Sequence, residues 1–180
     1  MNHFTANLRS LFDPESVAVI GASDKPDKLG FHVMKSLTKG GFGDKIIPVN
    51  PGTSEIMGIR VSESISDYDG RIDLAIVVLP AKLVSGVFRE CVTKGVKGIV
   101  LITAGFKEID DPAGTHLHKE IARIVNEAEI PVIGPNTFGM INFHANLNAS
   151  FTPEFSRIKK GGICLVSQSG GISHLLGFMA

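Results

Sequence analysis

The chain has 180 residues, of which 43% are hydrophobic and 20% are charged. This composition favours a packed globular core, most simply one domain with an appendage, and argues against disorder or a fibrous repeat. Eighteen basic and eighteen acidic side chains cancel, so the chain lacks the broad positive field that attracts nucleic acid or anionic lipid. We therefore expect no nucleic-acid partner and no membrane partner, and any bound anion must be held by local geometry.

Short apolar runs alternate with segments of helical periodicity along the chain. The predicted strands cover residues 17–20, 45–49, 74–79, 98–102 and 131–133. The predicted helices cover residues 31–39, 82–94 and 113–128, and glycine stops follow the first two. Residues 53–70 have weaker periodicity, which leaves their helical content open. Further on, residues 161–167 read as a strand and 169–180 as a helix, the start of a second β-α unit.

This alternation predicts an α/β fold, a Rossmann-like doubly wound and mostly parallel sheet. Such sheets bind ligands outside the carboxyl ends of their strands. The five predicted strand ends read "GASDK", "VNPG", "LPA", "TAGF" and "GPNTFG". One turn rich in glycine or proline is ordinary loop chemistry, but five at the same sheet edge indicate a ligand-binding groove.

The first strand end departs from the G-x-G-x-x-G pattern of dinucleotide-binding proteins. Ser23 replaces the second glycine, and Gly30 comes only after "DKPDKL". The longer loop offers the Ser23 hydroxyl and the ammonium groups of Lys25 and Lys28 to a phosphate. At the second strand end, Asn50 stands where NAD sites usually have Asp or Glu. A neutral amide tolerates a phosphorylated ribose, which NADP and coenzyme A both carry.

The remaining polar residues give little sign of other chemistry. Cys91 and Cys164 form no CxxC motif, and no histidine has a spacing typical of zinc ligands. His116 and His118 are two positions apart, so a helix would point them in different directions. The N-terminus lacks an apolar core of signal-peptide length. We therefore predict a cytoplasmic protein with no metal site.

Several segments, in order, resemble one known family. The run "SVAVIGASDKPDKLGFHVMKSLTKGGFGDKIIPVNP" and then "DLAIVVLPA", "GVKGIVLITAGFKE", "IPVIGPNTFGMIN" and "GGICLVSQSGGIS" are similar to the CoA-binding domain of ADP-forming acyl-CoA synthetases. These enzymes are relatives of the succinyl-CoA synthetase alpha subunit. The resemblance covers essentially the whole chain, and it implies coenzyme A as cofactor, lying across the strand ends.

By position, the resemblance implies a set of CoA-binding residues. With Lys28 from the same loop, they are Gly21, Ala22, Ser23 and Lys25 around the phosphate; Asn50 and Pro51 beside the nucleotide; Pro80 along the adenine or pantetheine wall; Thr103 and Ala104 at the fourth strand end; and Asn136 toward the thioester end. The family joins CoA to a carboxylic acid through an acyl phosphate and a phosphohistidine. The resemblance places that histidine beyond residue 180, so no catalytic residue is expected here, and His174 reads as a helix-face residue. The implied partners are CoA, a carboxylic acid or acyl-CoA, and an ATP-grasp domain or subunit.

The expected organisation is a CoA-binding domain over residues 1–145, a linker over 146–160, and the beginning of a truncated, flavodoxin-like ligase domain over 161–180. The chain stops at "LLGFMA" without a helix stop, so we expect it to be the N-terminal part of a longer protein. Two alternatives remain open. The chain could be a stand-alone CoA-binding regulatory module, or an NADP-binding oxidoreductase domain, which the absence of a catalytic constellation disfavours.

Overall fold

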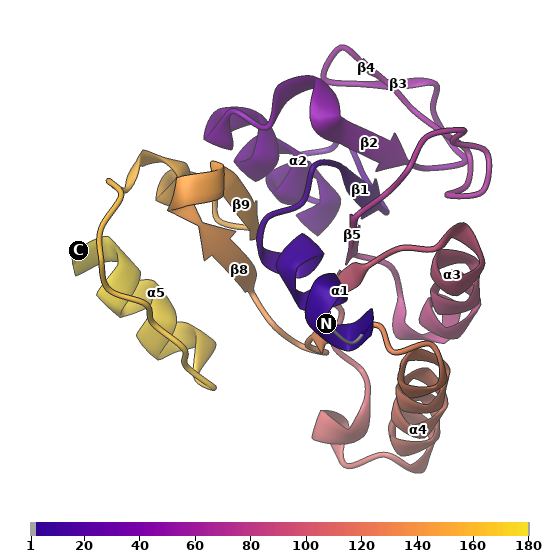
Figure 1. The fold of residues 1–180 in the computed structure, drawn as a ribbon. Helices are drawn as coiled ribbons and strands as arrows, with labels where there is room; N and C mark the ends of the chain where they lie inside the picture. Colours follow the sequence, from indigo (N-terminus) through magenta and orange to yellow (C-terminus); the bar gives the residue numbers. More distant parts are fainter. Residues whose placement is uncertain (1–2, 180) are drawn as a thin grey trace.

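The computed structural model describes residues 3–179, and its centre is a parallel sheet (Figure 1). The strand order is β2-β1-β5-β6-β7, with every neighbouring pair parallel. Its strands are β1 (Val17–Ile20), β2 (Ile46–Val49), β5 (Leu74–Val77), β6 (Gly98–Leu101) and β7 (Val132–Ile133). The predicted α/β, Rossmann-like fold is confirmed, and the strands are at most two residues shorter than predicted.

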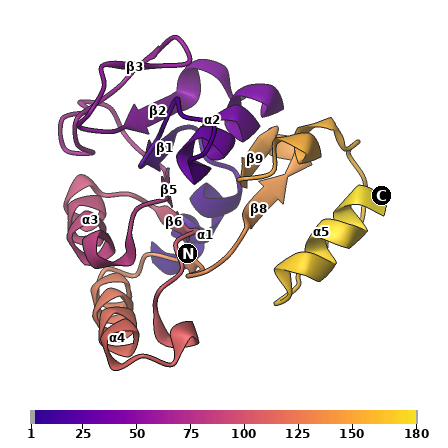
Figure 2. The same cartoon turned by 180° about the vertical axis from the view of Figure 1, so that it is seen from behind.

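Helices cover both faces of this sheet (Figures 1 and 2). One face packs against α3 (Ala81–Lys94) and α4 (Pro112–Glu127), and the other packs against α1 (His3–Phe12) and α2 (Leu29–Gly40). The sequence did not predict α1. As predicted, glycine follows the last turns of α2 and α3, and Gly41 and Gly95 both have positive φ. Short 3₁₀ helices complete the loops: η1 (Gly43–Lys45), η2 (Lys107–Ile109), η3 (Phe143–Ala145) and η4 (Pro153–Arg157).

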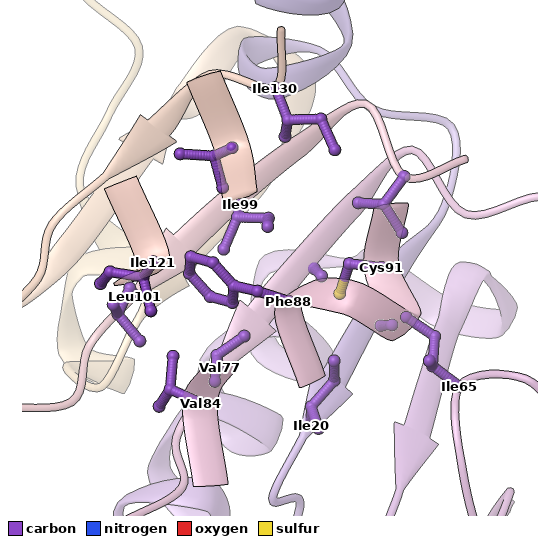
Figure 3. Close-up of a cluster of buried hydrophobic side chains, with 14 of the residues drawn as sticks. Ile20, Ile65, Val77, Val84, Phe88, Cys91, Ile99, Leu101, Ile121 and Ile130 are labelled. Carbon is purple, nitrogen blue, oxygen red and sulfur yellow. The ribbon is translucent and has the colours of Figure 1, made fainter. Parts of the chain in front are cut away.

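The core between the sheet and the α3–α4 layer is apolar and closely packed (Figure 3). Phe88 of α3 is fully buried at its centre, against side chains from β5, β6 and α4. Cys91 lies one turn further along α3, and burial raises the pKa of its thiol to about 12. The Cys91 side chain is therefore a neutral, unreactive core group, whereas Cys164 is exposed.

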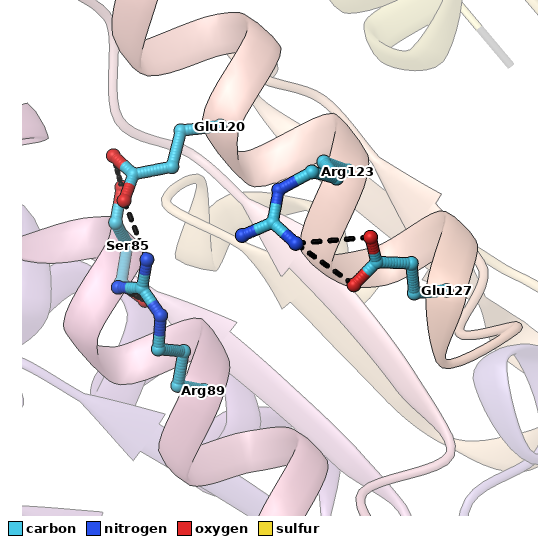
Figure 4. Close-up of polar contacts among 5 residues, drawn as sticks. All are labelled: Ser85, Arg89, Glu120, Arg123 and Glu127. Carbon is cyan, nitrogen blue, oxygen red and sulfur yellow. Dashed lines mark hydrogen bonds and ion pairs between the residues drawn. The ribbon is translucent and has the colours of Figure 1, made fainter.

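Polar side chains join the outer surfaces of α3 and α4 (Figure 4). Glu120 accepts hydrogen bonds from Ser85 Oγ at 2.7 Å and from Arg89 Nη2 at 2.6 Å. These two bonds lower the pKa of Glu120 below its ordinary value. Arg123 and Glu127 form a further pair within α4. The bonds of Glu120 to Ser85 and Arg89 hold the two helices together, and none of these groups lines the cavity at the strand ends.

The chain makes two small antiparallel sheets outside the central one. In the segment of weak periodicity, β3 (Glu55–Ile56) pairs with β4 (Ile59–Arg60), and no helix forms in residues 53–70. Further on, β8 (Gly139–Asn142) pairs with β9 (Leu147–Ser150). Residues 146–160, predicted as a linker, thus hold β9 and η4, which pack on α2. That segment is structured, and its role as a linker between two domains stays a prediction.

The last part of the described chain differs from its prediction in one respect. Residues 161–167 form no strand, because no described strand lies beside them to share a hydrogen-bond ladder. The helix predicted after them is present as α5 (Gly170–Met179). His174 is on the face of α5 that contacts residues flanking β8 and β9: its Nε2 lies 2.7 Å from Thr152 Oγ1, and its ring contacts those of Phe138 and Phe155.

Candidate functional site

A cavity of about 650 Å³ opens where the loops after β1, β2, β5 and β6 meet. This is the carboxyl edge of the sheet, where the strand order reverses between β1 and β5. Most of the residues that the sequence predicted as a binding site line it: Gly21, Ala22, Ser23, Lys25, Lys28, Asn50, Thr103 and Ala104. The structure therefore brings most of the predicted residues together around one cavity.

Two glycines shape the loop that follows β1. Gly21 has φ +92°, and a Cβ there would lie 2.6 Å from the Val78 carbonyl oxygen. Gly30, in the first turn of α2, is packed so closely that a Cβ would lie 2.0 Å from the Gly21 carbonyl oxygen. Gly21 thus has the role of the first glycine of the dinucleotide pattern, which makes the tight turn. Gly30 has the role of the third, which allows close helix packing, although the loop between the two is longer.

Polar groups of this loop face the cavity. Ser23 Oγ accepts a hydrogen bond from the Lys25 amide at 3.0 Å, which leaves its hydroxyl proton available to a ligand. Lys28 Nζ lies 3.6 Å from Asp27, while Lys25 forms no ion pair with any described residue. Asp24 also lines the cavity, so carboxylates partly offset the two ammonium groups. Lys25 is thus the cation most available to an anion.

Asn50 lies on the wall between the first two loops. Its Nδ2 donates to the Ala22 carbonyl at 2.7 Å, and its Oδ1 accepts from the Gly52 amide at 2.7 Å. One N–H and the oxygen of the side-chain amide therefore have partners within the protein. Sequence reasoning identified the residue but not these bonds, because they depend on where the side chain points.

The fourth and fifth strand ends are linked by Thr103. Its Oγ1 donates to the Leu79 carbonyl at 2.6 Å, and its own carbonyl accepts from the Asn136 amide at 2.9 Å. Asn136 has φ +54° and an exposed side chain beyond the cavity lining. Pro51 and Pro80 are also outside the lining, although each adjoins residues within it. The structure brings these three predicted residues near the cavity but not into its wall.

Glu108 orders the turn that follows Ala104. Its carboxylate accepts hydrogen bonds from the Gly105 amide at 2.7 Å and from the Phe106 amide at 3.1 Å. Partial desolvation raises the pKa of Glu108, but hydrogen bonds from backbone amides outweigh it, and the net pKa lies below the ordinary value. The ionised carboxylate thus holds this edge of the cavity in one conformation.

Sequence reasoning missed several lining residues. They are Asp24, Asp27, Leu29, Gly30, Gly52, Thr53, Val78 and Leu79. The position of Gly52 and Thr53 directly after "VNP" was a usable signal, since both belong to the second strand-end loop. Val78 and Leu79 looked like the end of a strand, whereas β5 ends at Val77.

The comparison with known families identifies the family of this chain. The profile of a family described as "CoA binding domain" matches residues 15–142, which contain every cavity-lining residue. The chain belongs to this CoA-binding family. Coenzyme A is accordingly its cofactor, as the sequence predicted.

Two curated relatives of this chain are named as ligases. The alpha subunit of ADP-forming acetate–CoA ligase II from Pyrococcus furiosus is 44% identical over 165 residues, which cover 92% of this chain and 35% of the relative. An ADP-forming acetate–CoA ligase from Methanocaldococcus jannaschii is 45% identical over 169 residues, covering 94% of this chain and 23% of the relative. The chain thus spans about a quarter to a third of these relatives.

A solved structure of an acetyl-coenzyme A synthetase also matches this chain. The dinucleotide-forming acetyl-coenzyme A synthetase 1 of Ca. Korarchaeum cryptofilum, in complex with phosphate and ADP, superposes with a TM-score of 0.88 at 36% identity. The match covers 96% of this chain and 36% of that one.

Among the residues described here, no helix has the length and apolar character needed to cross a membrane.

Proposed function

We propose that this chain is the CoA-binding portion of an ADP-forming acyl-CoA ligase. The observation that carries the proposal is the strand-end cavity, which combines a glycine turn, a free serine proton and an available lysine within the matched CoA-binding segment. The relatives named as ADP-forming acetate–CoA ligases support the reaction class. A stand-alone CoA-binding module is the second candidate, and it would use the same cavity.

In this proposal the chain binds and orients CoA. Lys25, Lys28 and the Ser23 hydroxyl hold phosphate oxygens, since charge-assisted hydrogen bonds are the strong ones at such sites. The thiol end then extends past Thr103 and Ala104 toward Asn136. Pro51 and Pro80 flank the nucleotide and the pantetheine.

The phosphoryl chemistry belongs to other parts of the ligase. No histidine is among the cavity-lining residues of the described chain, and both ring nitrogens of His174 have hydrogen-bond partners, Thr152 Oγ1 and the Gly170 carbonyl. We therefore assign the phosphohistidine and the ATP-grasp unit to a further segment or subunit, and the carboxylic acid to their joint site. The cytoplasm, favoured by the cysteine pattern, is the proposed location.

Calorimetric titration of this chain with CoA, NADP and NAD tests the proposal. We expect CoA to bind most tightly, because no acidic side chain stands at the end of β2 to favour an unmodified ribose. Tighter binding of NADP or NAD than of CoA would overturn the proposal in favour of an oxidoreductase domain.

The same titration distinguishes the two lysines. Lys25→Ala is expected to weaken CoA binding about tenfold, the lower end of the range for hydrogen bonds to charged groups, because the side chain is exposed. Lys28→Ala should have a smaller effect, since Asp27 already neutralises that ammonium group. Lys39→Ala, in the last turn of α2, is the control and should leave the affinity unchanged. Unchanged affinity in a Lys25→Ala, Lys28→Ala double variant would show that the lysines do not hold the phosphate.

A further inference from the structure

The chain passes from β2 into the next loop through Asn50 and Pro51, and the sheet ladder ends there. The Gly21 amide donates to the Val49 carbonyl at 3.0 Å, which is the last backbone bond between the β1 and β2 sides. The next donor on the β2 side would be residue 51, but proline has no N–H. The backbone amide of Asn50 itself turns away and donates to the Ser62 carbonyl at 3.0 Å.

The Asn50 side chain supplies a bond where the backbone cannot. Its Nδ2 reaches the Ala22 carbonyl on the neighbouring loop, and its Oδ1 holds the Gly52 amide on its own loop, both at 2.7 Å. The side-chain amide thus extends the contact between β1 and β2 into the loops that line the cavity. Ala22 and Gly52 both belong to the cavity wall.

The far part of the loop after β1 has a second anchor. His32 Nε2, on α2, lies 3.0 Å from the Pro26 carbonyl. The segment that carries Ser23 and Lys25 is therefore attached on both sides, to the β2 loop through Asn50 and to α2 through His32. A loop fixed in this way loses less conformational entropy when it binds a phosphate. The smaller entropy cost makes binding tighter.

We infer that Asn50 is a positioning residue, which sets the phosphate loop through Ala22 and Gly52 without contacting the ligand. The inference rests on the proposed CoA site and refines it. The alternative is a direct contact between Asn50 and the ribose phosphate, made through the second N–H of the side-chain amide, because the bond to Ala22 uses only one. The two accounts predict different responses to the removal of the 3′-phosphate.

The test is an Asn50→Leu variant, titrated with CoA and with dephospho-CoA. A positioning role, with the loop on the pyrophosphate that both ligands carry, predicts that both lose affinity by the same factor, about tenfold for one half-buried hydrogen-bonded group and its loop. A direct contact with the ribose phosphate predicts a loss for CoA alone, and that result would overturn the inference. Asn126→Leu, at the exposed end of α4 away from the cavity, is the matched control and should change neither affinity.

Hydrogen exchange of the ligand-free chain provides a readout that does not depend on CoA. In Asn50→Leu, amides of residues 21–30 and 50–53 should exchange faster while those of β5 and β6 keep their rates. Asn50→Asp keeps an acceptor for Gly52 and replaces the donor to Ala22 by a carboxylate oxygen that repels that carbonyl, so it should give the same local change if the leucine variant folds poorly. Faster exchange throughout the sheet, or unchanged exchange in the loop, would contradict a positioning role. If the native chain fails to bind CoA, the proposed function fails, while this loop test still stands.

Discussion

Replacing Gly30 by alanine is expected to abolish most CoA binding and to lower the free energy of unfolding by about 1–3 kcal/mol, the range for overpacking a close contact. The new Cβ would lie 2.0 Å from the Gly21 carbonyl oxygen and 3.2 Å from the Ser23 amide nitrogen. Both are backbone atoms, so neither can swing aside as a side-chain end would. The start of α2 must move away from the phosphate loop, and the cavity loses its shape.

Gly86→Ala is the matched control for this change. Gly86 lies within α3 on the exposed side, and a Cβ there would meet no atom within 4 Å. Alanine is the better helix former, so the control should raise the free energy of unfolding by about 0.5–1 kcal/mol and leave CoA affinity unchanged. Urea unfolding and calorimetry measure both quantities. A Gly30→Ala chain with native stability and native affinity would refute the close contact.

Replacing Phe88 by alanine should have the largest effect on stability, a loss of about 3–5 kcal/mol in the free energy of unfolding. The ring is fully buried and is surrounded by β5, β6 and α4, so its removal leaves a cavity as well as lost apolar contact (Figure 3). Urea unfolding followed by circular dichroism gives the change directly.

Phe12→Ala removes the same ring from the exposed end of α1, where 48% of the residue is accessible. The loss there should be at most about 1 kcal/mol, because half of the side chain already faces water. Equal losses in the two variants would mean that the packing around Phe88 is not the centre of the core.

The central sheet could be predicted because its strands are continuous apolar runs. Residues such as Val17 and Ile76 are buried on a sheet whose faces both carry helices, so no polar alternation hides the pattern. The glycines after α2 and α3 likewise predicted where these helices end. The strand-end loops followed from topology, and with them most of the cavity.

The β8–β9 sheet could not be predicted by the same reasoning. Residues 146–160 were predicted as a linker, and they are rich in polar side chains. In the structure Asn148 donates to the Thr152 carbonyl at 3.0 Å, and Ser150 donates to Asn148 Oδ1 at 2.6 Å, so these buried groups satisfy one another. Composition does not reveal such mutual hydrogen bonding.

The opposite error occurred at residues 161–167, where an apolar pattern predicted a strand. Ile163 is 97% exposed and Val166 is 92% exposed. An apolar pattern alone does not make a strand, because a strand also needs a neighbouring strand for its hydrogen bonds. No strand of the described chain pairs with residues 161–167. Prediction from sequence was incomplete for Asn50 as well. Its position was predicted, but its bonds to Ala22 and Gly52 depend on the direction of the side chain, which the sequence does not contain.

Hydrogen exchange with and without CoA tests most directly whether the strand-end cavity is the binding site. We expect CoA to slow exchange of the amides in residues 21–30, 50–53 and 103–105, which surround that cavity, and to leave the other end of the sheet unchanged. A smaller cavity lies at the start of α4, lined by Asp110, Asp111 and His116 among others. Protection confined to residues 110–119 would contradict the account, as would CoA binding that protects none of the strand-end loops.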